Sequence, residues 1–196
     1  MVVDSADVHP TALVSATARI WDMSQIRENA SIGDGVVIGR GVYVGIGVQV
    51  GPSTKIQNGA QIFEPARISR GVFIGPGTVL TNDRVPRAVD PNFRQKTAQD
   101  WSPVGVIVEE GASIGAASVC VAPLRLGRWS MVAAGSTVIR DVPDYALVAG
   151  NPATFIGWIS EEGDRLIQAS GSDVDWESAI TGRRYTLEAT GLAPRH

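Results

Sequence analysis

The sequence predicts an all-β fold in which short strands and tight turns alternate to form a parallel solenoid. The first observation is an aliphatic residue at every sixth position from Val8 to Leu80. The second is a small or β-branched residue four positions after each of them, from Ala12 to Thr78. A period of six matches neither the 3.6-residue period of a helix nor the two-residue period of an amphipathic strand. It matches a repeated strand-and-turn unit, which is typical of solenoids.

The hexads from Val8 to Leu80 resemble the hexapeptide repeat of the left-handed parallel β-helix. This resemblance implies that three hexads make one triangular coil. The left hand comes from the resemblance alone, because crossovers between parallel strands are otherwise right-handed. Stacked coils lie at strand spacing, about 4.8 Å. Residues three hexads apart in the sequence are therefore expected to be direct neighbours on adjacent coils.

The six-residue register stops at Leu80 and resumes from Val108 to Val138. Because the interval from 80 to 108 is not a multiple of six, residues 81–105 are predicted to leave the solenoid as a loop. Long irregular loops inside compact repeats are often functional. This loop carries Arg84 and Arg87 beside prolines, a pair suited to holding a phosphate.

The period disappears after residue 154. We therefore expect residues 1–154, with the loop, to form the β-helix domain and residues 155–196 to form a small appendage. Either an α/β unit or a hairpin would serve, since the open edge of the last coil needs a cover. Within the appendage, Glu161–Leu166 reads as a helical turn and Arg184–Leu187 as a short strand.

Composition limits the possible partners. The chain has 17 Lys and Arg against 20 Asp and Glu, a net charge of −3, which gives no electrostatic reason to expect nucleic acid or an anionic membrane. No apolar run long enough to span a membrane and no leader pattern is found, so no membrane span is expected. The single cysteine, Cys120, falls on the inward register and is predicted to be a core residue. A reducing cytoplasm is the simplest location.

One column of the predicted coils carries polar side chains. Glu64 and Asn82 each follow a register residue by two positions and are three hexads apart, so they should occupy the same corner of successive coils. A carboxylate and a carboxamide at the root of a basic loop form a candidate site. Ordinary solvated turn residues would explain the same pattern, and residue spacing alone leaves both interpretations open.

A wider resemblance covers the chain from about residue 30. The narrower motifs are Phe63-Glu64, Thr81-Asn82-Asp83 followed by Pro86-Arg87, and Gly157-Trp158-Ile159-Ser160-Glu161. They resemble the hexapeptide-repeat N-acetyltransferases that act on nucleotide-linked (UDP or dTDP) 3-amino sugars. The resemblance implies an acetyl-CoA-dependent sugar N-acetyltransferase of surface glycan or lipopolysaccharide biosynthesis. It also implies a homotrimer with its CoA and sugar grooves between subunits. Which nucleotide, which sugar, which carbon bears the amine, and whether the acyl group is acetyl stay open.

The same resemblance suggests roles for individual residues. Asn82 would hydrogen-bond the acceptor amine, and Glu64 would orient the amine or take its proton. Asp83 and Arg87 would contact the sugar nucleotide. The residues implied for CoA binding are Ala116, Ala134, Ile139 and Arg140. No metal is implied.

Most hexapeptide acetyltransferases use a histidine base, but the only histidines here are His9 and His196 at the two ends, so no histidine base is expected unless a terminus folds back. An amine acceptor needs mainly proximity, orientation and a proton acceptor, so we expect direct transfer without a covalent acyl-enzyme. A γ-type carbonic anhydrase, which shares the fold, is disfavoured because its zinc needs three histidine ligands. A non-catalytic β-helix scaffold or sugar-binding subunit is the remaining alternative.

Overall fold

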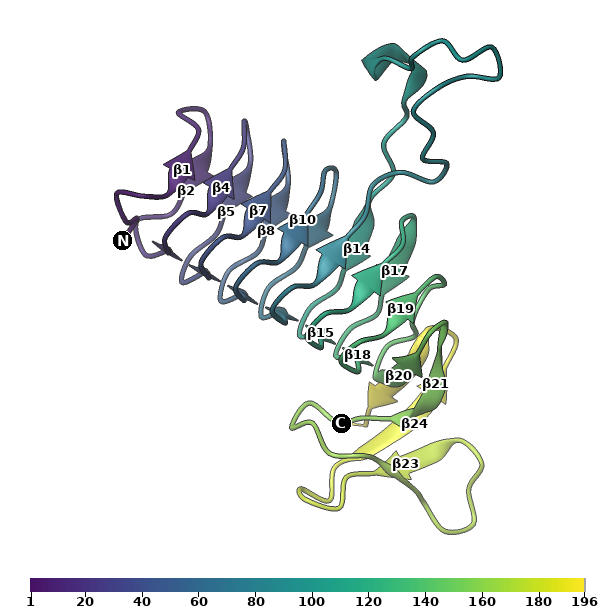
Figure 1. The fold of residues 1–196 in the computed structure, drawn as a ribbon. Coiled ribbons are helices and arrows are strands. Elements are labelled where there is room, and N and C mark those ends of the chain that lie inside the picture. Colours follow the sequence, from purple (N-terminus) through teal and green to yellow (C-terminus); the bar gives the residue numbers. More distant parts are fainter. Residues whose placement is uncertain (196) are drawn as a thin grey trace.

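A computed structural model describes residues 1–195, which fold as a left-handed parallel β-helix followed by a small separate sheet (Figure 1). Three sheets of parallel strands form the faces of a triangular prism, and from β1 to β20 the strands that follow one another in the chain belong to different sheets. Each strand pairs with the strand one coil further on, as Ile62 does with Leu80. The predicted fold and its coil of three hexads are confirmed.

The three sheets of the prism are called sheets 1, 2 and 3. Sheet 1 contains, in spatial order, β1 (Asp7–Val8), β4 (Gln25–Ile26), β7 (Tyr43–Val44), β10 (Gln61–Ile62), β13 (Val79–Leu80), β16 (Val119–Cys120) and β19 (Thr137–Val138). Sheet 2 contains β2 (Leu13–Val14), β5 (Ser31–Ile32), β8 (Gln49–Val50), β11 (Arg67–Ile68), β14 (Val106–Val108) and β17 (Leu124–Leu126). Sheet 3 contains β3 (Arg19–Ile20), β6 (Val37–Ile38), β9 (Lys55–Ile56), β12 (Phe73–Ile74), β15 (Ser113–Ile114), β18 (Met131–Val132), β20 (Ala146–Gly150) and β21 (Ala153–Trp158).

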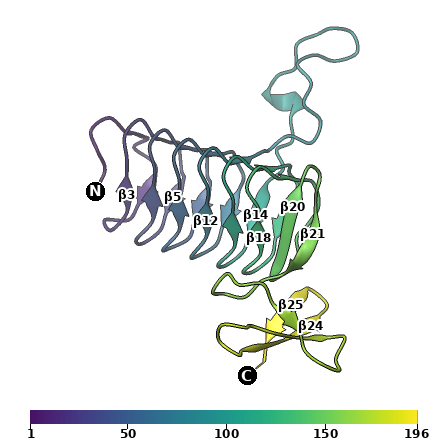
Figure 2. The ribbon, with the colours of Figure 1, turned by 60° about the horizontal axis from the view of Figure 1, so that its bottom comes forward.

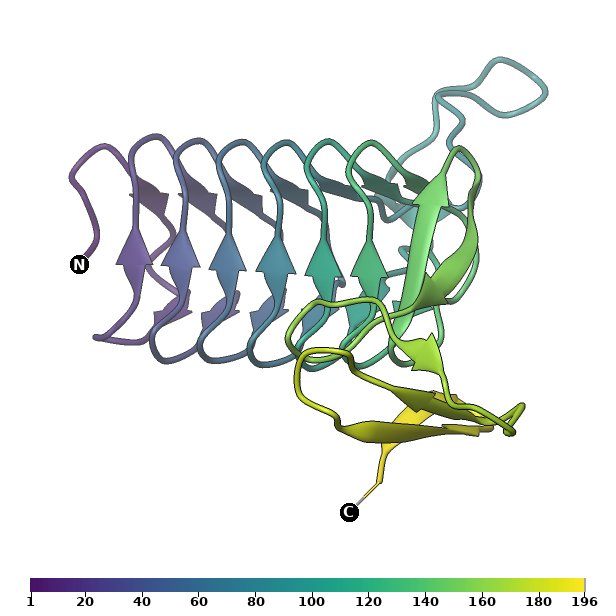
Figure 3. The ribbon, with the colours of Figure 1, turned by 90° about the horizontal axis from the view of Figure 1, so that it is seen from below.

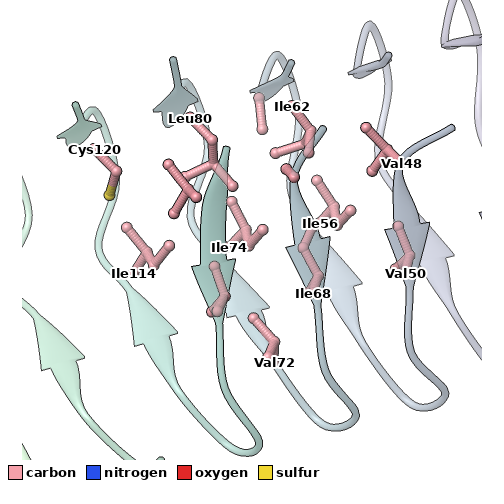
Figure 4. Close-up of a cluster of buried hydrophobic side chains, with 14 of the residues drawn as sticks. Val48, Val50, Ile56, Ile62, Ile68, Val72, Ile74, Leu80, Ile114 and Cys120 are labelled. Carbon is pink, nitrogen blue, oxygen red and sulfur yellow. The ribbon is translucent and has the colours of Figure 1, made fainter. Parts of the chain in front are cut away.

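The core consists of aliphatic side chains stacked along the prism axis (Figure 4). Successive residues of a strand point to opposite faces, so the second residue of each two-residue strand turns inward. Ile56, Ile62 and Ile74 are fully buried. Cys120 occupies the same position, and burial raises the pKa of its thiol to about 12. The prediction that Cys120 is a core residue is confirmed.

One coil contains a large insertion. β13 ends at Leu80 and β14 begins at Val106, and the segment between them projects away from the prism (Figure 1). Arg67 of β11 pairs with Gln49 on the preceding coil and with Ile107 on the following one. In the sequence, Arg67 and Ile107 are more than twice as far apart as Gln49 and Arg67. The insertion is therefore longer than a whole coil. The insertion contains the one helix found in residues 1–195, the 3₁₀ turn η1 (Ala98–Asp100).

A hairpin closes the far end of the stack (Figure 3). β20 continues sheet 3 in parallel with β18, and β21 returns antiparallel to β20 with a register shift between Leu147 and Val148. The backbone groups at the edge of β20 are therefore paired with the same chain.

The C-terminal appendage is an antiparallel sheet beside the last coils (Figure 2). Its strands are β22 (Ile167–Gln168), β23 (Asp175–Glu177), β24 (Arg184–Glu188) and β25 (Gly191–Pro194). It attaches through buried Asp144, whose backbone N–H donates to Thr190 (2.9 Å) and whose carbonyl accepts from Leu192 (3.1 Å). The strand predicted at Arg184–Leu187 is confirmed, and the hairpin alternative, not the α/β one, describes the appendage.

The helical turn predicted for Glu161–Leu166 is wrong. The segment forms a turn in which the Ser160 N–H donates to the carbonyl of Asp164 (2.9 Å). Gly163 within it has a φ of 92°, which a helix does not allow. Glu161 turns inward and accepts from the Tyr145 hydroxyl (3.0 Å). This tertiary contact outweighs the local helical preference of Glu161.

Among residues 1–195 there is no helix whose length and apolar character would let it cross a membrane.

Candidate functional site

A cavity of about 690 Å³ lies where the inserted loop leaves the prism. One wall comes from sheet 1 and the corner after it, with Tyr43, Phe63 and Glu64. The other comes from the two limbs of the loop, residues 82–87 and 96–104. The cavity therefore combines a rigid floor of stacked strands with side chains that the repeat does not specify.

Glu64 and Asn82 occupy equivalent places on adjacent coils. Each follows its strand by two residues, and the strands pair with Ile62 opposite Leu80. Both side chains line the cavity. The pairing of Leu80 with Cys120, and of Cys120 with Val138, extends this column of residues to Arg140. Arg140 thus lies two coils beyond Asn82, about 10 Å along the prism axis.

Glu64, which lines the cavity, has an unsatisfied acceptor. Its Oε2 is buried and has no hydrogen-bond partner within residues 1–195. The carboxylate lies against Gly45 of the preceding coil, where an added Cβ would meet the Glu64 carboxylate and stand 2.8 Å from the Glu64 backbone N. Because glycine has no Cβ, position 45 leaves the space that the Glu64 carboxylate occupies.

Two aromatic rings pack beside this carboxylate. The ring centroids of Tyr43 and Phe63 are 5.3 Å apart with a 46° interplanar angle. Burial, and then the charge of Glu64, raise the pKa of the Tyr43 hydroxyl above its usual value. Tyr43 is therefore neutral near pH 7 and contributes a hydroxyl and a ring, not a charge.

Three cations line the cavity from the loop, namely Arg84, Arg87 and Lys96. In the described part of the chain, none of them has a carboxylate within 4.0 Å. Arg84 and Arg87 are exposed, and Lys96 is half-buried. The loop therefore presents positive charge that its own side chains leave unpaired.

The two aspartates of the cavity are used by the loop backbone. Asp83 accepts from the N–H of Val85 (2.8 Å). Asp100 accepts from the N–H (2.9 Å) and hydroxyl (3.0 Å) of Thr97, and these bonds hold the pKa of Asp100 below its usual value. Both carboxylates thus stabilise turns, and in the described residues neither forms a salt bridge with the three cations.

The residues suggested for CoA binding lie on two different corners of the prism. Ala116 and Ala134 follow strands of sheet 3 on adjacent coils, where the N–H of Gly135 donates to the Ala116 carbonyl (2.8 Å). Ile139 and Arg140 follow β19 of sheet 1, and Arg140 lines a separate cavity of about 270 Å³. One chain therefore does not bring these four residues into a single cavity.

Several cavity residues were not predicted from the sequence as site residues. Tyr43 pairs with Gln61 one coil further on in sheet 1, so the coil rule could have placed it beneath the loop. Lys96 and Trp101 come from the returning limb of the loop, which has no register. No sequence signal places them beside Glu64.

Comparison with known proteins gives partial matches. No family model matches the chain. The dTDP-3-amino-3,6-dideoxy-alpha-D-galactopyranose 3-N-acetyltransferase of Aneurinibacillus thermoaerophilus is 56% identical over 55 residues, which are 28% of this chain and 29% of that protein. Serine acetyltransferase 4 of Arabidopsis thaliana is 34% identical over 113 residues, covering 53% of this chain and 31% of its own. The chain thus aligns with less than a third of either relative.

Solved structures match over more of the chain. A mutant GDP-perosamine N-acetyltransferase from Caulobacter crescentus, in complex with CoA and GDP-perosamine, is 25% identical with a TM-score of 0.52, covering 78% of this chain and 56% of that one. A hexapeptide-repeat acetyltransferase from Vibrio cholerae O1 biovar eltor, in complex with acetyl-CoA, is 24% identical with a TM-score of 0.54, covering 67% and 72%. The second likeness concerns the fold alone. Together the matches confirm the resemblance to hexapeptide-repeat acetyltransferases.

Proposed function

We propose that this chain, similar in sequence and fold to hexapeptide-repeat acetyltransferases, moves an acetyl group from acetyl-CoA to the amino group of a nucleotide-linked amino sugar. One observation carries the proposal: a single cavity combines a buried unpaired carboxylate oxygen with three unpaired cations. A ligand that satisfies both must have a hydrogen-bond donor, such as an N–H or ammonium group, and an anionic group. A nucleotide-linked amino sugar has both, the amine on its sugar and the negative charge on its diphosphate.

The carboxylate side of the cavity suits an amine. A buried acceptor without a donor costs about 1–3 kcal/mol, so a bound group that supplies N–H is stabilised there. The carboxamide of Asn82, one coil further on, can both donate and accept. A hydroxyl acceptor would need a strong base to activate it, whereas a neutral amine is already nucleophilic.

The cation side suits phosphate. Arg84 and Arg87 can each offer two N–H groups to phosphate oxygens, and Lys96 adds a point charge. The acidic residues nearby are engaged by Val85 and Thr97, so they leave this charge available. The same arrangement supports binding of the diphosphate of a UDP- or dTDP-linked sugar.

In the proposed reaction acetyl-CoA supplies the activated thioester. The amine nitrogen attacks the carbonyl carbon, the carbon–sulfur bond breaks, and the sulfur leaves with the bonding electrons. Asn82 holds the amine, and Glu64 orients it and accepts the proton that the nitrogen loses, a contribution of about 10²- to 10⁴-fold. His9 bonds Thr11 (2.9 Å) in the first coil, away from the cavity, and His196 lies outside the described residues. In this proposal the transfer is direct, and Glu64, not a histidine, takes the proton.

The side chains of the residues proposed to bind CoA are chemically suited to that ligand. The corner of Ala116 and Ala134 has small side chains that leave the backbone groups reachable, and Arg140 offers a guanidinium with no carboxylate partner in residues 1–195. Because these positions lie on two corners, we place CoA in a groove between subunits of a homotrimer, lined by one corner from each of two chains.

The proposal also includes the setting of the reaction. We assign it to the cytoplasm and to the assembly of surface glycans such as lipopolysaccharide. Residues 1–154, with the loop at 81–105, would be the acyltransferase domain, and residues 155–196 would cap it.

The test is an assay of CoA thiol release with acetyl-CoA and a panel of UDP- and dTDP-linked amino sugars. We expect release with at least one amino sugar and none with the matching sugar that lacks the amine. Asn82→Ala should lower kcat/KM by about 10²-fold or more, because it removes a group that holds the reacting amine. His9→Ala serves as the control and should retain activity.

Two results would contradict the proposal. No release with any member of the panel would favour a non-catalytic scaffold or sugar-binding subunit. Equal activity of the Asn82 and His9 variants would remove the site assignment.

A further inference from the structure

A second unsatisfied polar atom lies in the same cavity as Glu64. The indole N–H of Trp101 is buried and has no acceptor within residues 1–195, and Trp101 lines the cavity. An indole nitrogen can only donate a hydrogen bond. Among the residues that line the cavity, Glu64 therefore has one buried acceptor oxygen and Trp101 one buried donor, and the described chain satisfies neither.

The loop holds Trp101 near its base. Trp101 follows η1, whose start is fixed by the bonds between Thr97 and Asp100, and its own N–H donates to the Ala98 carbonyl (3.4 Å). Further along the same limb, the N–H of Val104 donates to the Asn82 carbonyl (3.1 Å) and joins the two limbs of the loop. Trp101 thus belongs to the limb that is bonded back to Asn82, and both residues line the cavity.

An unpaired indole is not by itself a binding group. A second tryptophan of the chain, Trp176, serves as the comparison for Trp101. Trp176 also has a buried N–H without a partner in the described residues. It lies in β23 of the appendage, where it packs edge-on against Trp158 with ring centroids 6.5 Å apart. Trp101 differs because it lines a cavity that Glu64, with its unpaired carboxylate oxygen, also lines. Phenylalanine would keep an aromatic ring at this position without a buried unpaired donor, so the donor suits an acceptor that arrives with a ligand.

The chemistry of the cavity indicates which acceptor that is. The cations of the loop are exposed or half-buried and are suited to the charged diphosphate. The indole N–H and the Glu64 oxygen are buried and are suited to a neutral, hydrogen-bonding part of the ligand. In a nucleotide-linked amino sugar this part is the sugar ring, which carries the amine and hydroxyl oxygens together.

We propose that Trp101 is a specificity-determining residue whose indole N–H donates to a hydroxyl oxygen of the sugar ring that carries the acceptor amine. This inference rests on the proposed function and deepens it. Glu64 recognises the nitrogen of the sugar, and Trp101 recognises an oxygen of the same ring. The site therefore discriminates against amino sugars that lack that hydroxyl, because a buried donor would then stay unpaired.

The test compares Trp101→Phe with the matched control Trp176→Phe. Calorimetry would measure the binding of a UDP- or dTDP-linked amino sugar, of the same compound with the hydroxyls next to the amine replaced by hydrogen, and of UDP or dTDP alone. We expect Trp101→Phe to weaken binding of the full compound about tenfold, the effect of one lost hydrogen bond. Its binding of the deoxy compound and of the free nucleotide should match the wild type, and Trp176→Phe should change none of the three.

Each outcome separates the inference from the function. Unchanged binding by Trp101→Phe, or equal weakening for the sugar compound and the free nucleotide, overturns the role of Trp101 and leaves acetyl transfer standing. Wild-type protein that binds the amino sugar but releases no thiol overturns acetyl transfer and leaves the Trp101 contact standing. Wild-type protein that binds no compound of the panel overturns both. The deoxy compound binding to wild-type protein about tenfold more weakly than the full compound supports the contact without any substitution.

Discussion

The coil that ends at Leu80 and the loop that begins at Thr81 are neighbours in sequence but are held together differently. The strands of the coil are tied to coils on both sides, as Gln61 pairs with Tyr43 and with Val79. No residue from Thr81 to Gly105 is fully buried, and most hydrogen bonds of the loop are local, such as that between Asp90 and Arg94. The repeat supplies the stability, and the loop supplies groups that are left free to bind.

This difference explains why polar groups are unpaired where they are. The repeat itself pairs the backbone of an inner strand with the coils on either side, so a coil has little capacity left for a ligand. In the loop, Asp83 and Asp100 accept bonds within its own turns, and Arg84, Arg87 and Lys96 have no carboxylate partner in the described residues. The candidate site forms where the coils meet the loop. Glu64 comes from a coil, and Asn82 lies where the loop leaves the prism.

The largest effect that would test this comparison is on stability. Ile56→Ala should lower the free energy of unfolding by about 2–5 kcal/mol, because Ile56 is fully buried and its removal leaves a cavity. Val85→Ala, in the loop where Val85 is 62% exposed, should change it by less than about 0.5 kcal/mol. Urea unfolding of both variants measures the two values. Similar losses would mean that the loop is part of the cooperative core.

A second prediction concerns the one glycine on which the Glu64 side chain depends. Gly45→Ala should cost about 1–3 kcal/mol through overpacking and should also abolish most turnover, because the new methyl group displaces the carboxylate. Gly33→Ala is the matched control. A Cβ there would stand 2.9 Å from the Pro52 backbone N, a similar crowding on a corner that is not part of the cavity.

Gly33→Ala should therefore lose comparable stability, measured by thermal unfolding, and keep its turnover in the thiol-release assay. Comparable turnover in the two variants would show that the position of Glu64 does not matter for the reaction.

The structure of the coils could be predicted from the sequence, whereas that of the loop could not. The register from Val8 to Val138 determines which side chains are buried and which stack on the next coil, so the coil, its core and the column of Glu64 and Asn82 follow from counting. The loop has no period, so the place of Trp101 depends on contacts that counting does not reveal. The turn at Glu161 was misjudged because two tyrosine hydroxyls hold that carboxylate from distant parts of the chain.

The smallest expected effect is a local response of the loop to acid. The pKa of Asp100 in the folded chain is below its ordinary value, so the bonds to Thr97 stabilise the loop above that ordinary value of about 3.9. This stabilisation should be lost as the pH falls through the lower folded pKa. NMR titration of the Thr97 amide should show its signal moving in this range while the amides of sheet 1 do not.

Asp100→Asn keeps an acceptor that does not titrate, so the Thr97 signal should then be independent of pH. A simultaneous change in the sheet 1 amides would indicate that coil and loop respond to acid as one unit.

The exit and return of the loop leave the pairing of the coils unchanged. Val79 pairs with Gln61 on one side and with Val119 on the other, in the same register on both sides of the insertion. Chains of this architecture can therefore exchange one such excursion for another of different length and sequence at little thermodynamic cost, since closure entropy grows only slowly with length. Acceptor preference can diverge through this exchange while the ladder of isoleucines and valines is inherited unaltered.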